Sequence, residues 1–276
     1  MRVNGTLAFR AVSILFYHAV QDDWPSAMAV PRADFEAQCA WLQRSGRVVP
    51  LQEWVRRFRS SRRPPALTAI TFDDGFASVY DVALPILRRY DLPATVFVVG
   101  RTLDGDDVRV DWTTTVPHGG LTTLGAERIR EMLGLGITFG SHGHTHRDLT
   151  ALSPSECERD LAESRARLEQ ITGTRVDFLA YPFGAHNAGV RQAARRAGYT
   201  HAFGTTSGRD PVAPYGIPRA GVYAGDRGAM LQVKTSRLYL PVRRGRAYPL
   251  LRRVLKGGGS PPGGERASGA GERRLR

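Results

Sequence analysis

Short apolar runs that resemble β-strands alternate along the chain with stretches of helical periodicity, and this alternation limits the fold more than any other feature. The strand-like runs lie near residues 12–17, 67–72, 94–99, 136–141, 176–181 and 201–205. Strands that alternate with helices form parallel sheets, because each helix carries the chain back to the start of the next strand. The pattern therefore predicts an α/β fold in which polar residues at the carboxyl ends of the strands form the active site.

The stretch 153–172 shows how clearly one of these helices is encoded. Ser153 and Glu156 have the spacing of a capping box, Pro154 stands at the first helical position, and Gly173 follows the last turn. Its apolar face is marked by Leu161, Leu168 and Ile171. We therefore expect a helix that packs one side against the sheet.

Two short polar segments contain the residue types that bind metal ions. Asp73 and Asp74 directly follow the apolar run at 67–72. His142 and His146 are four residues apart, so one turn of helix would place both imidazoles on the same face. Two histidines and one carboxylate leave a coordination position open, which is typical of a catalytic rather than a structural zinc site.

Each segment has a plainer interpretation when it is taken alone. Asp-Asp-Gly is common in simple turns, and a histidine-rich loop can be solvated surface. The two segments together, each next to a predicted strand, favour a metal site, with one aspartate as ligand and its neighbour as a base. The two cysteines, Cys39 and Cys157, are not spaced as ligands and are expected to be small buried hydrophobic residues.

Residues 70–75, 141–146 and 181–184 resemble the polysaccharide deacetylases that carry a NodB-type domain, and the resemblance extends from about residue 12 to about residue 222. It implies a single domain with an irregular, incomplete (β/α) barrel of about seven parallel strands. It also implies that Asp73 is the general base, and that Asp74, His142 and His146 bind a divalent ion. Zinc is the expected ion, although cobalt, nickel or iron suits the same ligands.

The segment 14–20, Ile-Leu-Phe-Tyr-His-Ala-Val, resembles the amino-terminal segment of the exopolysaccharide N-deacetylase branch of this family. That branch is circularly permuted, and its catalytic acid comes from the first strand. The resemblance therefore implies that His18 protonates the leaving amine. A buried histidine that completes a strand is the alternative.

The third family motif departs from the common pattern, because no arginine occurs within residues 179–182. Arg219 could approach Asp73 from another strand end and lower the pKa of its carboxyl group. The resemblance assigns Tyr181, Phe183 and Gly184 to oxyanion and substrate binding, through a backbone N–H at this turn. The later aspartate motif and the late leucine-histidine motif of the family have no match in the chain.

The resemblance implies removal of N-acetyl groups from N-acetylglucosamine-type residues of a polysaccharide or a saccharide precursor. An acetyl-ester hydrolase of a polysaccharide is a close alternative, since an alkoxide leaves more readily than an amine. A binding module that recognises acetylated sugar without catalysis, or a hydrolase of a small cyclic amide, also remains open. Trp24, Trp112 and Tyr223 could stack on sugar rings if they line the cleft, although packing is the simpler role for each.

The predicted barrel domain comprises residues 1–240, followed by a basic segment at 241–256 and a Gly/Pro/Arg-rich tail at 257–276 that we expect to be disordered. Nine arginines and one lysine against two glutamates give residues 241–276 a charge of +8, out of a formal +13 for the whole chain. Such a segment could contact an anionic membrane surface. Nucleic acid is not an expected partner, because basic and aromatic residues are not interleaved.

The chain has 276 residues and no apolar stretch long enough to cross a bilayer. Its early apolar run at 11–17 is short, is assigned to a strand, and lacks the basic region and cleavage site of a secretory signal. A cytoplasmic location is therefore expected, and it favours a lipid-linked or nucleotide-linked saccharide precursor as substrate.

Overall fold

The computed structural model describes residues 13–60, 66–105, 108–206, 212–236 and 238–245. Seven parallel strands form a closed barrel in the order β1-β4-β5-β6-β7-β8-β9. The ring closes because β1 pairs with β4 on one side and with β9 on the other. The predicted parallel barrel of about seven strands is thus confirmed, with one strand fewer than the eight of the common (β/α) barrel.

The barrel strands are short and almost completely buried. They are β1 Ile14–Tyr17, β4 Ala69–Phe72, β5 Ala94–Val98, β6 Thr138–Ser141, β7 Phe178–Ala180, β8 His201–Thr205 and β9 Ile217–Gly221. Two further strands, β2 Ala19–Val20 and β3 Ala29–Val30, pair with each other beside the barrel.

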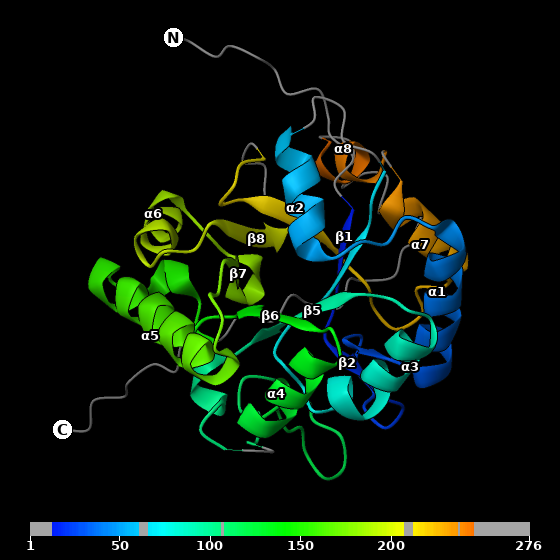
Figure 1. The fold of residues 1–276 in the computed structure, drawn as a ribbon, viewed down its shortest axis with the longest axis horizontal. Coiled ribbons are helices and arrows are strands. Elements are labelled where there is room, and N and C mark those ends of the chain that lie inside the picture. Colours follow the sequence, from blue (N-terminus) through cyan, green and yellow to red (C-terminus); the bar gives the residue numbers. More distant parts are fainter. Residues whose placement is uncertain (1–12, 61–65, 106–107, 207–211, 237, 246–276) are drawn as a thin grey trace, which may run out of the picture. The chain divides into compact units, whose positions relative to one another are not determined.

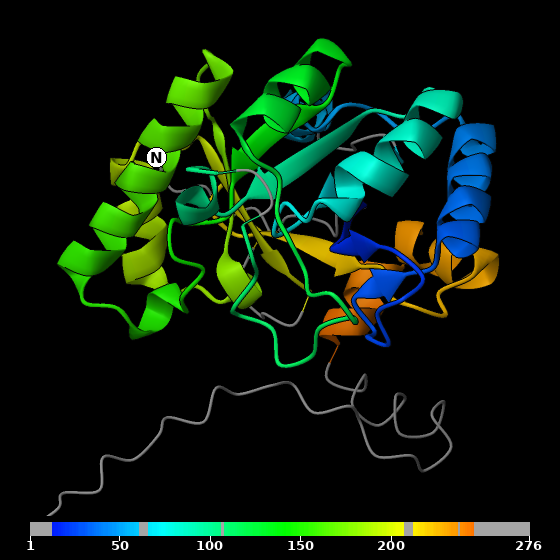
Figure 2. The same cartoon turned by 90° about the horizontal axis from the view of Figure 1, so that it is seen from below.

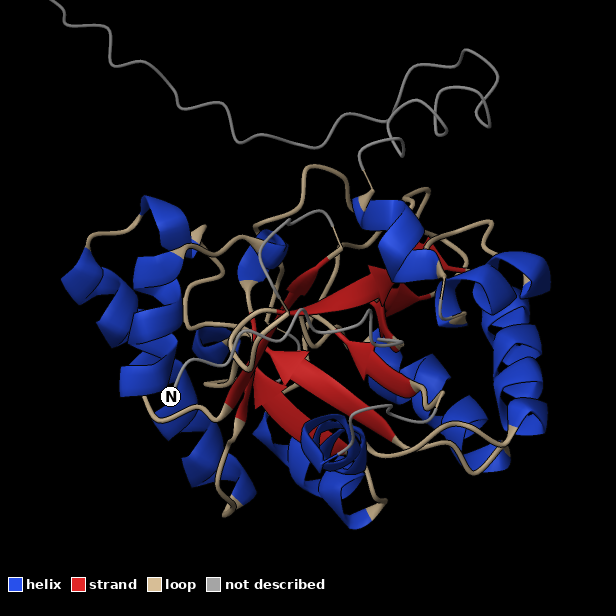
Figure 3. Cartoon of the chain, turned by 90° about the horizontal axis from the view of Figure 1, so that it is seen from above, coloured by secondary structure: helices blue, strands red, loops and turns tan. Residues whose placement is uncertain are grey.

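Helices surround the strands on the outside of the barrel (Figure 3). They are α1 Arg32–Ser45, α2 Leu51–Ser60, α3 Leu84–Arg89, α4 Ala126–Gly134, α5 Pro154–Thr172, α6 Ala188–Arg196, α7 Gly228–Thr235 and α8 Tyr239–Arg244. Helices α1, α3, α4, α5 and α6 follow one another around the ring in chain order (Figures 1 and 2). Each barrel strand is thus followed by a helix or a loop that returns the chain to the end of the barrel where the next strand begins.

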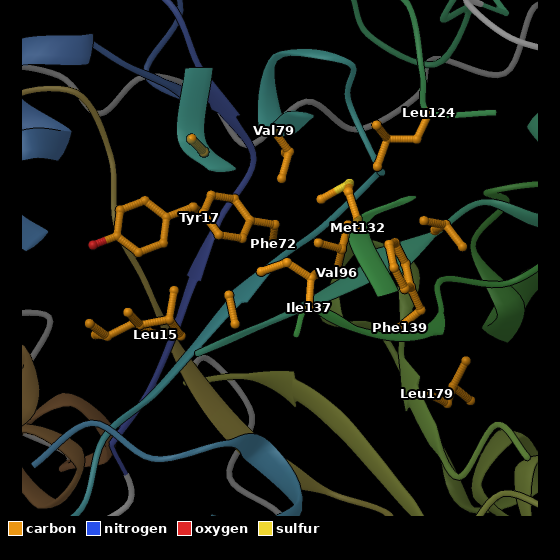
Figure 4. Packing of buried hydrophobic residues seen from close by; sticks show 14 of the residues in the cluster. Leu15, Tyr17, Phe72, Val79, Val96, Leu124, Met132, Ile137, Phe139 and Leu179 are labelled. Atoms are coloured by element: carbon orange, nitrogen blue, oxygen red, sulfur yellow. The ribbon is translucent and has the colours of Figure 1, made fainter. Parts of the chain in front are cut away.

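Alternation along the strands divides the apolar side chains into an outer and an inner set. The outer set packs against the helices and forms the main core (Figure 4). In β1, for example, the ring of Tyr17 packs edge-on against Phe35 of α1, with centroids 5.3 Å apart, and stacks on Phe72 of β4. The helices are therefore held by the residues that point away from the barrel axis.

The inner set fills the barrel with large side chains that pack against small ones. Phe97 of β5 lies so close to Gly140 of β6 that a Cβ added to the glycine would stand 2.5 Å from the Phe97 ring. Phe97 also contacts Phe203 of β8, with ring centroids 5.8 Å apart. Small and large residues thus alternate across the interior, as dense packing requires.

The strand-like runs read from the sequence coincide with six of the barrel strands, and the helix predicted at 153–172 is confirmed. In α5, Ser153 and Glu156 form the capping box, and Gly173 ends the helix in the left-handed conformation, with φ 65°. The seventh barrel strand, β9, was not among the predicted runs. Its five residues include Pro218, which cannot donate a ladder hydrogen bond and argues against a strand when the sequence is considered alone.

The predicted basic segment and tail lie almost entirely outside the described residues, which end at residue 245. The helix α8 covers the start of the basic segment. In the part of the chain that the structure describes, no helix has both the length and the apolar character needed to cross a membrane.

Candidate active site

Asp73 and Asp74 follow β4 at the carboxyl end of the barrel, and they point in different directions. Asp73 continues the inner side of the strand, and its backbone N–H donates to the carbonyl of Tyr17 in β1. Asp74 has a positive φ of 69°, which turns the chain out of the strand. The predicted division of the pair into two differently placed carboxylates follows from this turn.

The side chain of Asp74 faces two histidines. Its Oδ1 lies 3.0 Å from Nε2 of His146 and 3.5 Å from Nε2 of His142. One ligand atom from each residue fits within a span of 4.8 Å, and all three side chains are buried. Among the described residues, Asp74 Oδ1 makes no hydrogen bond despite its burial. Three converging metal-ligand atoms with an unpaired carboxylate oxygen fit a divalent cation.

The two histidines lie on a loop, and the suggested helical turn is wrong. His142 directly follows β6, whereas Gly143 and His146 have positive φ values of 76° and 56°. These conformations fold the chain back, so that both imidazoles approach Asp74 without helical geometry. The four-residue spacing thus identified the pair correctly through an incorrect local structure.

The side chain of Asp160, in α5, is hydrogen-bonded to this loop. Its carboxylate accepts hydrogen bonds from the backbone N–H groups of His144 and Thr145, at 2.7 and 3.0 Å, and from the hydroxyl of Thr145 at 2.6 Å. Only 5% of Asp160 is exposed. The carboxylate therefore pairs backbone N–H groups of the loop that a helix or a strand would otherwise pair.

Burial and charge set the protonation of the ligand set. Burial lowers the pKa of His142 to about 4, so this imidazole is neutral near pH 7. Burial alone would raise the pKa of Asp74, but the interactions with His146, His18 and His142 hold it below its usual value. The carboxyl group of Asp74 is therefore charged, as metal binding requires.

Arg219 of β9 reaches Asp73 through the interior of the barrel. Its two terminal nitrogens donate to the two carboxylate oxygens of Asp73, each at 2.7 Å, and one of them also donates to the hydroxyl of Thr71 at 3.1 Å. The guanidinium lies over the rings of Phe16 and Phe97, at 4.9 and 5.2 Å. Burial raises the pKa of Asp73, but Arg219 and His142 outweigh this effect and leave it lowered.

His18 follows β1 on the same side of the barrel as the two aspartates. Its ring packs edge-on against Phe16, with centroids 5.5 Å apart. The pKa values of Asp73 and Asp74 are both lowered, and the interaction with His18 is one of the smaller causes for each. His18 Nδ1 is buried and has no hydrogen-bond partner among the described residues.

The three residues assigned to oxyanion and substrate binding lie at the turn after β7, and their surroundings differ from one another. The side chain of Tyr181 is fully buried on the outer side, and its hydroxyl donates to the carbonyl of Tyr215. Strand alternation explains this outcome, because Ala180 occupies the inward position. The N–H of Gly184 donates to the Tyr181 carbonyl within the turn, at 2.8 Å. Phe183 is 59% exposed and its ring lies 4.9 Å from that of His146.

The three aromatic residues considered as sugar-stacking candidates also separate. Trp24 is only 3% exposed and donates through Nε1 to the Thr115 hydroxyl, so it is a packing residue. Tyr223 is 39% exposed beside Phe16, and its hydroxyl lies against Gly221. Trp112 stacks on the ring of His146, with centroids 4.9 Å apart.

Two features of the site were not predicted from the sequence, namely Asp160 and the contact of Trp112 with His146. A signal for Asp160 was present, because a carboxylate occurs among the apolar positions of the helix at 153–172 and has to be paired when it is buried. The contact of Trp112 had no local signal, since this residue lies in the long connection between β5 and α4.

Comparison with known proteins places these residues in a family. The family model for polysaccharide deacetylases matches residues 60–202. Over 188 residues the chain is 27% identical to "Putative polysaccharide deacetylase YxkH" of Bacillus subtilis. The aligned region covers 67% of this chain and 61% of that relative. It is also 27% identical over 207 residues to the poly-beta-1,6-N-acetyl-D-glucosamine N-deacetylase of Staphylococcus epidermidis, covering 69% of this chain and 67% of that relative.

Solved structures show the same fold. The deacetylase PplD of Streptococcus pyogenes, solved in complex with acetate, superposes with a TM-score of 0.70 at 23% identity, covering 82% of this chain and 98% of that one. IcaB of Ammonifex degensii superposes with a TM-score of 0.63 at 24% identity, covering 84% and 97%. The match of the family model over the Asp-Asp and histidine segments, together with the barrel, shows that the chain belongs to the polysaccharide deacetylase family.

Proposed function

We propose that this protein is a metal-dependent hydrolase that removes N-acetyl groups from N-acetylglucosamine-type residues of a polysaccharide or saccharide precursor. The observation that carries the proposal is the arrangement of five side chains at the carboxyl end of the barrel. Asp74, His142 and His146 converge on one point, Asp73 lies beside them in an ion pair with Arg219, and His18 directly follows β1 at the same end of the barrel.

Asp74, His142 and His146 would hold the ion, for which we propose zinc; cobalt, nickel and iron fit the same donors. A bound divalent ion would lower the pKa of water and polarise the acetyl carbonyl. His142 is prepared for this role, because its Nδ1 donates to the Ala180 carbonyl at 2.8 Å and its Nε2 faces Asp74. Such a hydrogen bond fixes the tautomer of a ligand histidine.

Asp73 is the base in this proposal. Its carboxylate accepts a proton from the water that attacks the acetyl carbon, and Arg219 keeps the carboxylate charged and oriented for that transfer. The backbone N–H of Phe183 would stabilise the charge that develops on the carbonyl oxygen. His18 then donates a proton to the nitrogen as the carbon–nitrogen bond breaks, giving acetate and a free amine.

The amino-sugar substrate is proposed from the relatives together with the site. The Staphylococcus epidermidis relative is named for de-N-acetylation of poly-beta-1,6-N-acetyl-D-glucosamine. Amide cleavage requires a proton donor for the leaving nitrogen, and we assign that role to His18, which follows β1 at the end of the barrel that carries the two aspartates. An ester substrate would depend on this donor much less, which makes His18 the residue that distinguishes the two reactions.

The test is acetate release from N-acetylglucosamine oligomers by protein loaded with zinc or cobalt, measured beside an O-acetylated sugar. Asp73→Asn and His18→Ala should each lower amide hydrolysis by about 10²–10⁴-fold. Asp81→Asn and His118→Ala change exposed residues of the same types and should leave the rate unchanged. Metal-loaded protein that releases acetate from the ester alone would establish the ester hydrolase instead, and release from neither substrate would leave a sugar-binding role.

A further inference from the structure

The two histidines of the proposed metal site are oriented by different means. His142 has the usual arrangement, in which the ring nitrogen opposite the ligand atom donates a hydrogen bond, here to the Ala180 carbonyl at 2.8 Å. His146 does not have it. Its Nδ1 is buried and makes no hydrogen bond within the described ranges.

Two aromatic rings enclose the imidazole of His146 instead. Trp112 stacks on it with centroids 4.9 Å apart and an interplanar angle of 29°. Phe183 meets it edge-on, with centroids also 4.9 Å apart and an angle of 66°. Arg101 covers the indole of Trp112 at 5.1 Å and pairs with the neighbouring Asp111. The imidazole of His146 therefore packs against two aromatic rings, one face-on and one edge-on, and Arg101 covers the face-on ring.

These contacts act on a residue whose own backbone conformation is unfavourable. The residue lies on a loop and has a positive φ of 56°, a conformation that non-glycine residues adopt at a cost. Phe183 has a positive φ of 58° in the turn after β7. Trp112 lies in the connection between β5 and α4, where the bridge between Arg109 and Thr122 holds the chain. Three loops thus contribute one planar side chain each.

We propose that Trp112 and Phe183 are positioning residues that hold the ring of His146, so that its Nε2 faces the metal position in the absence of a hydrogen bond to Nδ1. The inference rests on the metal site of the proposed function. Aromatic contacts of this kind contribute to stability beyond the area that they bury, because their geometry is specific. The connection between β5 and α4 is consequently part of the metal site, although none of the three proposed ligands lies on it.

The experiment measures metal binding directly, by titrating metal-free protein with Co²⁺ and recording both calorimetric affinity and the visible absorption spectrum. Trp112→Ala and Phe183→Ala should each weaken Co²⁺ binding, and Trp112→Ala should do so by about tenfold or more, as the loss of a group that orients a ligand does. The spectrum of bound Co²⁺ should change as well, because the direction of one ligand is altered. Trp112→Phe keeps a stacking ring and should restore affinity to within about threefold of wild type.

Tyr223→Ala is the matched control, since it removes another partly exposed aromatic ring from the same end of the barrel without contact to His146. Its Co²⁺ affinity and spectrum should equal those of wild type. Thermal melting of each metal-free variant shows whether weaker Co²⁺ binding comes from unfolding or from a misoriented His146 ring. Because Phe183 is exposed, Phe183→Ala tests the contact with His146 without changing the loop that carries Trp112.

Wild-type affinity and spectrum in both Trp112→Ala and Phe183→Ala would overturn the proposal, as would a Trp112→Phe variant that binds as weakly as Trp112→Ala. Neither result concerns hydrolysis. Conversely, wild-type protein that binds Co²⁺ but releases no acetate would overturn the proposed function and leave the positioning role intact.

Discussion

Arg219 donates one hydrogen bond to each carboxylate oxygen of Asp73, and both distances are 2.7 Å. The two residues are 146 positions apart in the chain and meet because β9 pairs with β1, which in turn pairs with β4. Arg219 is 1% exposed and Asp73 is 3% exposed. This paired geometry supplies at Asp73 the arginine that the segment 179–182 lacks.

Replacing Arg219 by Met should move the acid limb of the pH–rate profile to higher pH. The pKa of Asp73 is lowered in the folded protein, because Arg219 and His142 outweigh the raising effect of burial. Without the guanidinium this pKa rises, and the base loses its proton only at higher pH. Arg227→Met, at a side chain that is 84% exposed, is the control. An unchanged acid limb in Arg219→Met would show that Asp73 is not the titrating base.

The same substitution should destabilise the protein, by about 3–5 kcal/mol near pH 7, because it leaves a buried charge without its partner. A carboxyl group with a lowered folded pKa contributes stability above its unfolded pKa and loses it as the pH falls through the folded value. The difference in unfolding free energy between wild type and Arg219→Met should therefore shrink in acid. Urea unfolding at pH 7 and in acid measures this difference, and an equal difference at both pH values would contradict the assignment.

Asp160→Ala should lower both thermal stability and metal affinity. The change leaves three donors of the histidine loop without their acceptor, two backbone N–H groups and the Thr145 hydroxyl. Each buried unpaired donor costs about 1–3 kcal/mol, and each kcal/mol corresponds to roughly 2–4 °C in melting temperature for a domain of this size. Calorimetry of the metal-free protein and a Co²⁺ titration provide the two measurements.

Asp148→Ala is a suitable comparison for Asp160→Ala. Asp148 also accepts hydrogen bonds from a backbone N–H and a hydroxyl, both of Thr150, but it does so at an exposed turn. Its removal should cost far less and leave Co²⁺ affinity unchanged. Equal effects of the two substitutions would show that the burial of Asp160 beneath the histidine loop has no special importance.

Gly140→Ala should destabilise the barrel by about 1–3 kcal/mol, because the added methyl group overpacks the interior. Its Cβ would stand 2.5 Å from the ring of Phe97 and 3.0 Å from the Phe178 carbonyl. Gly134→Ala in α4 should have the opposite sign, a gain of about 0.5–1 kcal/mol, since nothing lies within 4 Å and alanine favours the helix. Urea unfolding of the pair measures both, and a stabilised Gly140→Ala would contradict the packing described.

Added Zn²⁺ should raise the melting temperature of the wild-type protein and have little effect on Asp74→Asn. Asp74 supplies the charged ligand, and its unpaired Oδ1 faces both histidines. A ligand that binds only the folded state at 100 times its dissociation constant stabilises it by about 2.7 kcal/mol. Differential scanning calorimetry with and without Zn²⁺, with Asp81→Asn as control, makes the comparison. An equal shift in Asp74→Asn would place the ion elsewhere.

Local patterns in the sequence were enough to predict the parallel α/β arrangement, α5 and the candidate site segments, whereas the barrel itself was implied by the family resemblance. The capping box at Ser153 is a contact between residues three apart, and the alternation of strands with helices is a property of neighbouring segments. The position of Asp73 and Asp74 at a strand end is equally local. These features depend on propensities and periodicities that act within a few residues.

Tertiary structure decided which of the residues named from the sequence come together and how their side chains are oriented. Closure of the barrel made residues 217–221 a strand despite Pro218, and it brought Arg219 to Asp73. Strand alternation turned Tyr181 away from the site, while a loop held by Asp160 took the place of the helical turn expected for the histidines. Such contacts join residues distant in the chain, and their free energy depends on burial and geometry that exist only once the barrel has closed. The candidate site residues, Arg219 among them, could therefore be named from the sequence, whereas their contacts and orientation followed from packing.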